Sequence, residues 1–158
     1  MKDRKQIIPL NGWRVEPRAR ASIYPEPFAS RMAGRVKRVL GDRFGVTAFG
    51  VNLVTLAPGA VSALFHRHTV QDEFVFVIEG EVTLIHDDGE TVMRAGDCIG
   101  FPHGGTAHCL VNRSGAAASY LEVGDRAPGD SATYPRDDLV AQHGEEGWRL
   151  THRDGRPY

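Results

Sequence analysis

Turn-forming residues recur about every 8–12 residues between positions 46 and 124, and this spacing limits the possible folds more than any other feature of the chain. Glycine, proline and aspartate cluster at these turns, for example at Pro58-Gly59 and Asp87-Asp88-Gly89. The segments between the turns are short and rich in β-branched and apolar residues. Short strands with regularly spaced turns are typical of an antiparallel sandwich or barrel. The sequence therefore predicts an all-β domain.

The segments that flank this region lack its pattern. Residues 1–30 carry four prolines and no sustained periodicity, which predicts an irregular arm with room for one short strand. A helical turn is expected within residues 29–40 and a short helix over residues 137–142. A chain of 158 residues suits one compact domain. We therefore expect an N-terminal arm (1–44) and a C-terminal tail (125–158) to pack around a barrel of residues 45–124.

Charge and hydrophobicity exclude several functional classes. The formal net charge is −1, so no strong field attracts nucleic acid or an anionic membrane. The chain has no apolar run long enough for a membrane span or a secretory signal, and we expect a cytoplasmic protein. The two cysteines, Cys98 and Cys109, are not part of a CxxC motif. We expect both to be reduced and structural.

The sequence His66-Arg67-His68 is the strongest chemical signal, together with Glu73 shortly after it. Residues two apart on a strand share a face, so the two imidazoles can converge on one ion. Glu73 begins the next expected strand, and a hairpin would return its carboxylate beside the histidines. His108 would complete the set from a later strand. Such donors suit Fe, Mn, Ni, Co, Cu or Zn.

Spacing alone leaves other interpretations open. An HxH sequence in a loop is often solvated surface, Glu73 could be a surface carboxylate, and His108 could be a hydrogen-bonded core histidine.

The glycines and prolines around these residues complete two motifs that resemble those of the cupin family. The first family motif is G-x5-HxH-x3–4-E-x6-G, and the chain matches it with Gly59, His66, His68, Glu73 and Gly80. The second is G-x5-P-x-G-x2-H-x3-N, which the chain matches with Gly96, Pro102, Gly104, His108 and Asn112. Each match carries one extra residue, after Gly59 and after Gly104. The resemblance covers roughly residues 45–124.

The resemblance implies a fold and a metal site. Cupins are antiparallel jelly-roll barrels, also called double-stranded β-helices. The family's metal ligands match His66, His68, Glu73 and His108 in this sequence. We therefore expect one divalent transition metal, with Zn, Mn, Fe and Ni as the candidates.

Three functions follow from a metal in a barrel. The chain is similar to short bacterial cupins that are commonly described as sugar-phosphate isomerases, which makes metal-dependent isomerisation of a sugar or sugar phosphate the leading hypothesis. The alternatives are an Fe(II)-dependent dioxygenase and a cupin that binds a small polar ligand without catalysis. The catalytic residues are not identified, although His103 and Tyr120 are conceivable bases. A phosphate group would need cations, for which the candidates are Arg43, Arg67, Arg94, Arg113 and Arg126.

The N-terminal arm is unusually apolar for an irregular segment. It contains Ile7, Ile8, Leu10, Trp13, Val15, Ile23, Tyr24 and Phe28. We expect the arm to cover a barrel edge, its own or a partner's, in a homodimer.

Overall fold

Antiparallel strands form almost all the regular structure of the computed structural model, which describes residues 8–20 and 22–158. The largest sheet has five strands, joined in the order β1, β2, β9, β4 and β7. Their bounds are Arg35–Val39, Phe49–Leu56, Ala118–Asp125, Glu73–Glu79 and Cys98–Phe101. β1 pairs with β2 along its whole length, so a segment of the expected arm extends this sheet within the same chain. The all-β prediction is confirmed.

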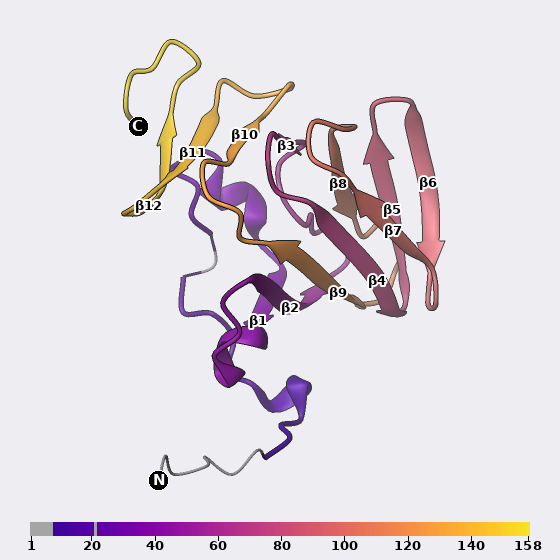
Figure 1. Ribbon diagram of the computed structural model, residues 1–158. Coiled ribbons are helices and arrows are strands. Elements are labelled where there is room, and N and C mark those ends of the chain that lie inside the picture. Colours follow the sequence, from indigo (N-terminus) through magenta and orange to yellow (C-terminus); the bar gives the residue numbers. More distant parts are fainter. Residues whose placement is uncertain (1–7, 21) are drawn as a thin grey trace, which may run out of the picture.

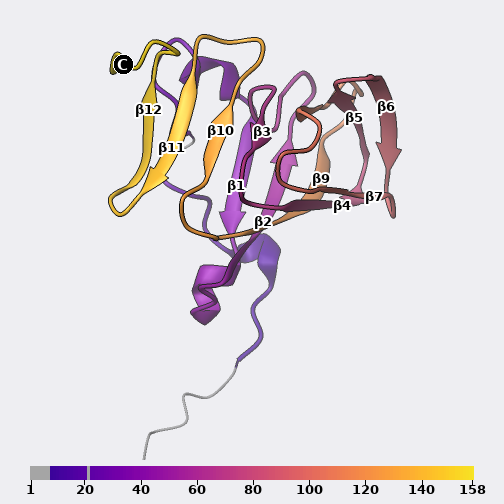
Figure 2. The same ribbon diagram turned by 45° about the horizontal axis from the view of Figure 1, so that its top comes forward.

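The opposite wall combines two smaller sheets. One joins β6 (Gly89–Arg94), β5 (Glu81–His86) and β8 (His108–Val111). The other joins β12 (Gly147–Thr151), β11 (Val140–Gly144), β10 (Ser131–Thr133) and β3 (Arg67–His68). An isolated bridge from His66, next to β3, to His108 of β8 connects the two, and a second bridge joins Val61 to Val111 of β8. Figures 1 and 2 show β10–β12 beside β3, with β5 and β6 at the far end of the barrel.

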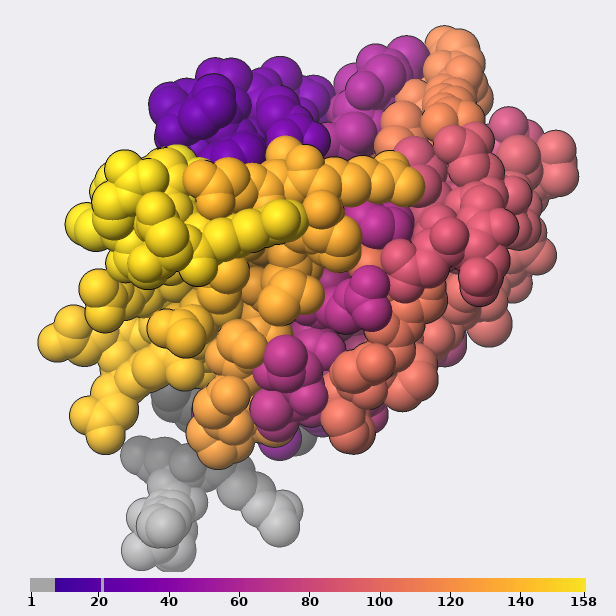
Figure 3. All heavy atoms as spheres, turned by 90° about the horizontal axis from the view of Figure 1, so that it is seen from above, coloured from indigo at the N-terminus to yellow at the C-terminus, as the bar shows by residue number. Residues whose placement is uncertain are grey.

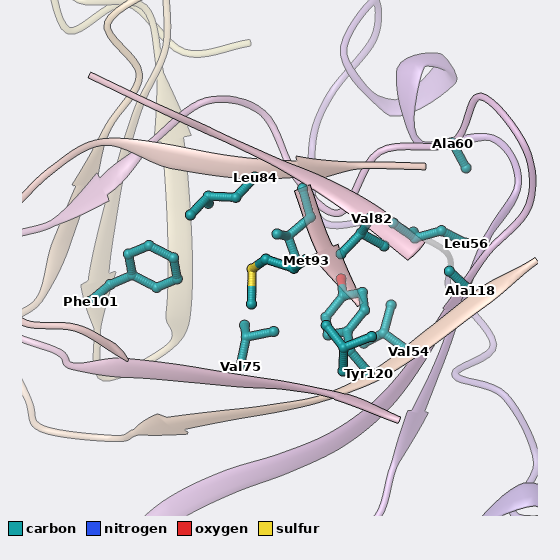
Figure 4. Packing of buried hydrophobic residues seen from close by; sticks show 12 residues of the cluster. Val54, Leu56, Ala60, Val75, Val82, Leu84, Met93, Phe101, Ala118 and Tyr120 are labelled. Carbon is teal, nitrogen blue, oxygen red and sulfur yellow. The ribbon is translucent and has the colours of Figure 1, made fainter. Parts of the chain in front are cut away.

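The barrel interior is closed at one end by apolar side chains from both walls (Figure 4). Alternate residues of β2, β4 and β9 point inward, as strand geometry requires. Tyr120 and Val54 are fully buried there. The remaining members of this cluster are Leu56, Ala60, Val75, Val77, Val82, Leu84, Met93, Phe101, Leu110 and Ala118.

A second apolar cluster joins the two flanking segments to the barrel. Tyr24, Phe28 and Met32 of the N-terminal segment pack with Tyr134 and Leu139 of the C-terminal segment. Figure 3 shows these segments, in indigo and yellow, next to each other and on the opposite side of the molecule from β5 and β6. Both segments are therefore part of the packed structure around the barrel mouth.

The helices within residues 8–20 and 22–158 are short 3-10 turns: η1 (Gly12–Arg14), η2 (Ala29–Met32) and η3 (Gly41–Phe44). The helical turn expected within residues 29–40 is confirmed by η2. In the described part of the chain no helix has the length and apolar character needed to cross a membrane.

Some sequence predictions need correction, and others concern residues that the structure does not describe. The short helix expected over residues 137–142 is wrong, because Val140–Gly144 is strand β11 and pairs with β12. Leu139 and Ala141 are both buried, which is the two-residue period of a strand. The strand expected from residue 46 begins at Phe49, after η3. Residues 1–7 of the expected arm, with Ile7, lie outside the described residues, as does residue 21.

Candidate metal centre

Four side chains from three segments meet at the open end of the barrel. His66 and His68 flank the start of β3, Glu73 begins β4 and His108 begins β8. The bridge between His66 and His108 joins two of these segments, and β4 lies across from them with Glu73 facing the histidines. The Nε2 atoms of His108, His66 and His68 lie 3.1, 3.6 and 3.7 Å from Oε2 of Glu73. One donor atom from each of His66, His68 and Glu73 lies within 4.8 Å of the others.

The second nitrogen of each imidazole faces an acceptor, and this determines which nitrogen carries the proton. Nδ1 of His66 donates to the Leu64 carbonyl at 2.8 Å, and Nδ1 of His108 faces the Thr106 carbonyl at 3.4 Å. Nδ1 of His68 donates to Oδ2 of Asp130 at 2.5 Å. Without a cation, Nε2 of His66 can carry a proton toward Glu73, and loss of that proton leaves Nδ1–H with a free lone pair on Nε2. This is the tautomer in which a neutral histidine binds a metal through Nε2.

Burial and charge at this cluster favour a cation. His66 and His108 are buried, and Oε2 of Glu73 is a buried oxygen without a hydrogen bond of good geometry. Burial alone would raise the pKa of Glu73, but the contacts with His108 and His66 hold it well below its usual value. Burial would also lower the pKa of His66, and the Glu73 carboxylate outweighs burial and raises it. A divalent ion fits this donor set, because it can satisfy one carboxylate and several neutral imidazoles together.

Asp130 is a site residue that the sequence patterns missed. Its side chain is 1% exposed and lies between β3 and the loop that follows it. Besides holding His68, its Oδ1 accepts backbone N–H groups of Thr69, Val70 and Gln71 at 3.1, 2.9 and 3.3 Å. Burial opposes its ionisation, yet His68 and these N–H groups lower the pKa of Asp130. The fixed carboxylate therefore orients the His68 ring.

Aromatic rings stack on two of the imidazoles. Phe101 stacks on His108 with ring centroids 3.4 Å apart and planes 2° from parallel. Tyr134 stacks more loosely on His66 at 5.9 Å. These contacts limit rotation of the rings and exclude water from one side of the cluster.

His66, His68, Glu73 and His108, called the donor cluster below, line a cavity of about 440 Å³. Gly50 and Gly124 lie in register with Glu73 on adjacent strands, and the Arg126 side chain lies next to Gly50. Tyr24, Tyr134 and Trp148 supply aromatic surface, and Asn52, Glu122, Arg18, Arg35 and Lys37 supply polar groups. The cavity has the size and mixed lining of a small-molecule site.

Most of the residues that the sequence suggested as a base or as a phosphate site do not line the cavity. His103 is exposed, pairs with Asp72 and does not line the cavity, whereas Tyr120 does line it. Four of the five candidate arginines form ion pairs: Arg67 with Asp87, Arg94 with Glu81, Arg113 with Glu90 and Arg126 with Asp42. Arg126 is the one of the five that lines the cavity, and Arg43 is exposed. Arg18, Arg35 and Lys37 were missed because they lie in the segment without a recognisable pattern.

Comparison with known proteins agrees with this architecture. Residues 52–124 match the family model described as the cupin domain. No curated protein matches the sequence. Among solved structures, a cupin-superfamily sugar phosphate isomerase from Silicibacter pomeroyi is 43% identical over 96% of each chain, with a TM-score of 0.90.

More distant structures share the fold. A protein of Acidithiobacillus ferrooxidans, described as a candidate sugar phosphate isomerase, is 26% identical with a TM-score of 0.72 and covers 86% of this chain and 95% of its own. A polyketide cyclase from Streptomyces resistomycificus is 20% identical with a TM-score of 0.61 and covers 76% of this chain and 80% of its own. At this identity the second likeness concerns the fold alone.

Proposed function

The chain belongs to the cupin superfamily, and on that basis we propose that it is a metal-dependent isomerase of a sugar or sugar phosphate. The observation that carries the proposal is the convergence of three Nε2 atoms on one buried carboxylate oxygen at the wall of a polar cavity. The similarity to a protein described as a sugar phosphate isomerase, at 43% identity over nearly the whole chain, supports the substrate class.

The metal ligands in this proposal are His66, His68, Glu73 and His108. His108 is included because its Nε2 is the nitrogen nearest to Oε2 of Glu73. A divalent ion held by these side chains would polarise a substrate carbonyl and make the neighbouring C–H bond more acidic. Four protein ligands leave one or two coordination positions for the substrate in a five- or six-coordinate ion.

Glu122 is the proposed base for proton transfer. The carboxylates that line the cavity in the described part of the chain are Asp42, Glu73, Glu122 and Asp125. Asp42 is paired with Arg126, and Asp125 accepts backbone N–H groups through both oxygens. Oε1 of Glu122 is paired with Lys37 and also accepts from Asn52, and the residue lines the cavity. A carboxylate within reach of a substrate C–H can move a proton between adjacent carbons.

Tyr120 is better suited to donate a hydrogen bond than to act as a base. Its hydroxyl is fully buried and makes no hydrogen bond of good geometry with the described residues. Burial, followed by the charge of Glu122, raises the pKa of Tyr120 well above its usual value. The hydroxyl therefore keeps its proton at neutral pH.

The first experiment measures metal content. Purified protein is expected to contain close to one transition ion per chain, and His66→Ala with His68→Ala to abolish it, because an incomplete ligand shell binds weakly. Elemental analysis of both proteins gives the answer. Unchanged metal content in the double variant would refute the ligand assignment.

The second experiment tests the reaction. Protein restored separately with Fe(II), Mn(II) or Zn(II) is incubated with aldose and ketose phosphates under air and under argon. Isomerisation that needs no oxygen is the expected result. In Glu122→Gln, kcat is expected to fall by about 10²–10⁴ with unchanged metal content, and the exposed Glu145→Gln serves as the control. Fe(II)-dependent oxygen uptake would instead establish an oxygenase, and ligand-induced stabilisation without turnover would establish a binding protein.

A further inference from the structure

Two segments bring three cations to the same part of the cavity wall. Arg35 and Lys37 are two residues apart on β1, so they share the face that lines the cavity. The backbone N–H of Arg18 donates to the Lys37 carbonyl at 2.8 Å, which holds residue 18 beside β1. Arg18 lines the same cavity as the donor cluster.

Among the described residues, Lys37 has a carboxylate partner on this wall, whereas Arg18 has none. Nζ of Lys37 lies 2.5 Å from Oε1 of Glu122, which neutralises that lysine. In the described residues no carboxylate forms an ion pair with Arg18, and its Nε donates to the Arg20 carbonyl. Burial lowers the pKa of Arg18, and the positive charges of Arg35 and Arg20 lower it further against the attraction of Glu122. Arg18 and Arg35 line the same cavity, and the backbone contact of Arg18 with β1 places both residues on the same part of its wall.

Two guanidinium groups on a cavity wall suit one ligand class in particular. Each presents a planar fork of N–H donors that matches two oxygens of a phosphate or carboxylate. Arg35 already places one donor on the Ser62 carbonyl, which orients its side chain across the cavity from β1. Neither arginine belongs to residues 52–124, the part that matches the cupin model.

We propose that Arg18 and Arg35 form an oxyanion subsite that binds the phosphate group of a phosphorylated substrate while its sugar part reaches the donor cluster. This rests on the proposed function and deepens it, because it selects a sugar phosphate over a neutral sugar. The cavity of about 440 Å³ contains both groups of side chains in one continuous space. A substrate held at two points is oriented at its reacting carbons.

Inorganic phosphate is the probe for the subsite. Its dissociation constant is measured by calorimetry for the full-length wild-type protein, Arg18→Gln, Arg18→Lys and the control Arg43→Gln. Arg43 is exposed and outside the cavity, so its substitution removes the same charge from another place. The series is repeated in the His66→Ala/His68→Ala background, where phosphate cannot be held by an ion at the donor cluster.

Arg18→Gln is expected to weaken phosphate binding by about tenfold or more in both backgrounds, since a hydrogen bond to a charged group is lost. Arg18→Lys should bind with intermediate affinity, and Arg43→Gln like the wild type. Wild-type affinity in Arg18→Gln, or equal weakening in Arg43→Gln, overturns the subsite. Melting temperatures verify folding, and if Arg18→Gln does not fold, Arg18→Lys decides: unchanged phosphate affinity overturns the proposal.

A second comparison separates the subsite from the proposed reaction. Arg18→Gln should raise the dissociation constant of a hexose phosphate and leave that of the matching hexose unchanged. A hexose that binds wild-type protein as tightly as its phosphate contradicts the subsite, whatever the enzyme catalyses. Intact phosphate discrimination without isomerase activity would contradict the reaction alone.

Discussion

At the scale of single residues, Asp130 shows how a side chain can act on the candidate metal through another. It holds Nδ1 of His68 and three backbone N–H groups at once. We predict that Asp130→Asn weakens metal affinity by about 10–100-fold, because the ring of His68 loses a charged acceptor that fixes its orientation. Competition with a coloured chelator measures this. The exposed Asp88→Asn should match the wild type, and equal affinities in both variants would show that Asp130 has no role at the site.

Cys109 allows a prediction about pH. Burial raises its pKa to about 11. The thiolate is the reactive form, so a raised pKa lowers reactivity at any pH below it, and only on the order of 10⁻³ of the thiol is ionised at pH 8. In a Cys98→Ser variant, in which Cys109 is the remaining thiol, native protein should react slowly with a disulfide reagent at pH 8 and increasingly fast toward pH 11. Denatured protein is the reference, and rapid native reaction at pH 8 would contradict the burial of Cys109.

Sequence patterns predicted the residues of the donor cluster but not the residues that surround it. His66, His68 and Glu73 lie within eight positions, so strand alternation and one turn can bring them together, and the resemblance to cupins selected this arrangement over a solvated surface. Asp130 lies 62 positions from the histidine it holds, and Arg18 lies in an irregular segment. No local periodicity relates such residues, because their proximity is a product of tertiary packing.

At the scale of elements, the turn between β4 and β5 depends on Gly80. Its φ is +75°, and a Cβ added there would lie 2.8 Å from the Ala117 carbonyl oxygen and from Cα of Ala118. Gly96, in the turn before β7, has a φ of +94° but no atom within 4 Å of such a Cβ. An alanine at Gly96 would therefore cause backbone strain alone, whereas an alanine at Gly80 would cause backbone strain and steric overlap.

We predict that Gly96→Ala lowers the free energy of unfolding by about 1–2 kcal/mol, the cost of an unfavourable φ. Gly80→Ala should lower it by a further ~1–3 kcal/mol, because the backbone of β9 must move. Urea denaturation of both variants gives the comparison. Equal losses would mean that the β4–β5 turn relaxes without cost.

The strands of the barrel were easier to predict from the sequence than the strands outside it. Turn residues mark both ends of β5 and β6, and the Asp87-Asp88-Gly89 signal lies at their hairpin. β11 was mistaken for a helix because a short segment with two buried residues fits either periodicity. Its strand form depends on β10 and β12, which are defined by pairing and not by their own composition.

At the scale of the whole molecule, the outer face of β4 and its neighbours in the five-stranded sheet carries exposed apolar side chains. Phe74 and Phe76 on β4 are 42% and 38% exposed. Their cross-strand neighbours are Val123 and Leu121 on β9, and Gly100 and Cys98 on β7. A contiguous apolar surface of this kind is typical of an interface between protein chains.

We predict that the protein is a homodimer at micromolar concentration and that Phe76→Lys shifts it to monomer, because a charge would be buried in the interface. Sedimentation velocity measures the state. Val92→Lys, at an equally exposed position on β6, should remain dimeric. A monomeric wild-type protein would count against the dimer, and a monomeric Val92→Lys would place the interface elsewhere.

The cavity is divided between two parts of the chain that can vary separately. The proposed metal ligands lie at positions 66–108, whereas Arg18, Arg35 and Lys37 come from the first 44 residues. Substitutions in that segment can change which molecules are retained without disturbing the ligands of the ion. Under the proposed function, specificity can therefore evolve through Arg18 and Arg35, whereas a change at Lys37 would also reach the proposed base Glu122.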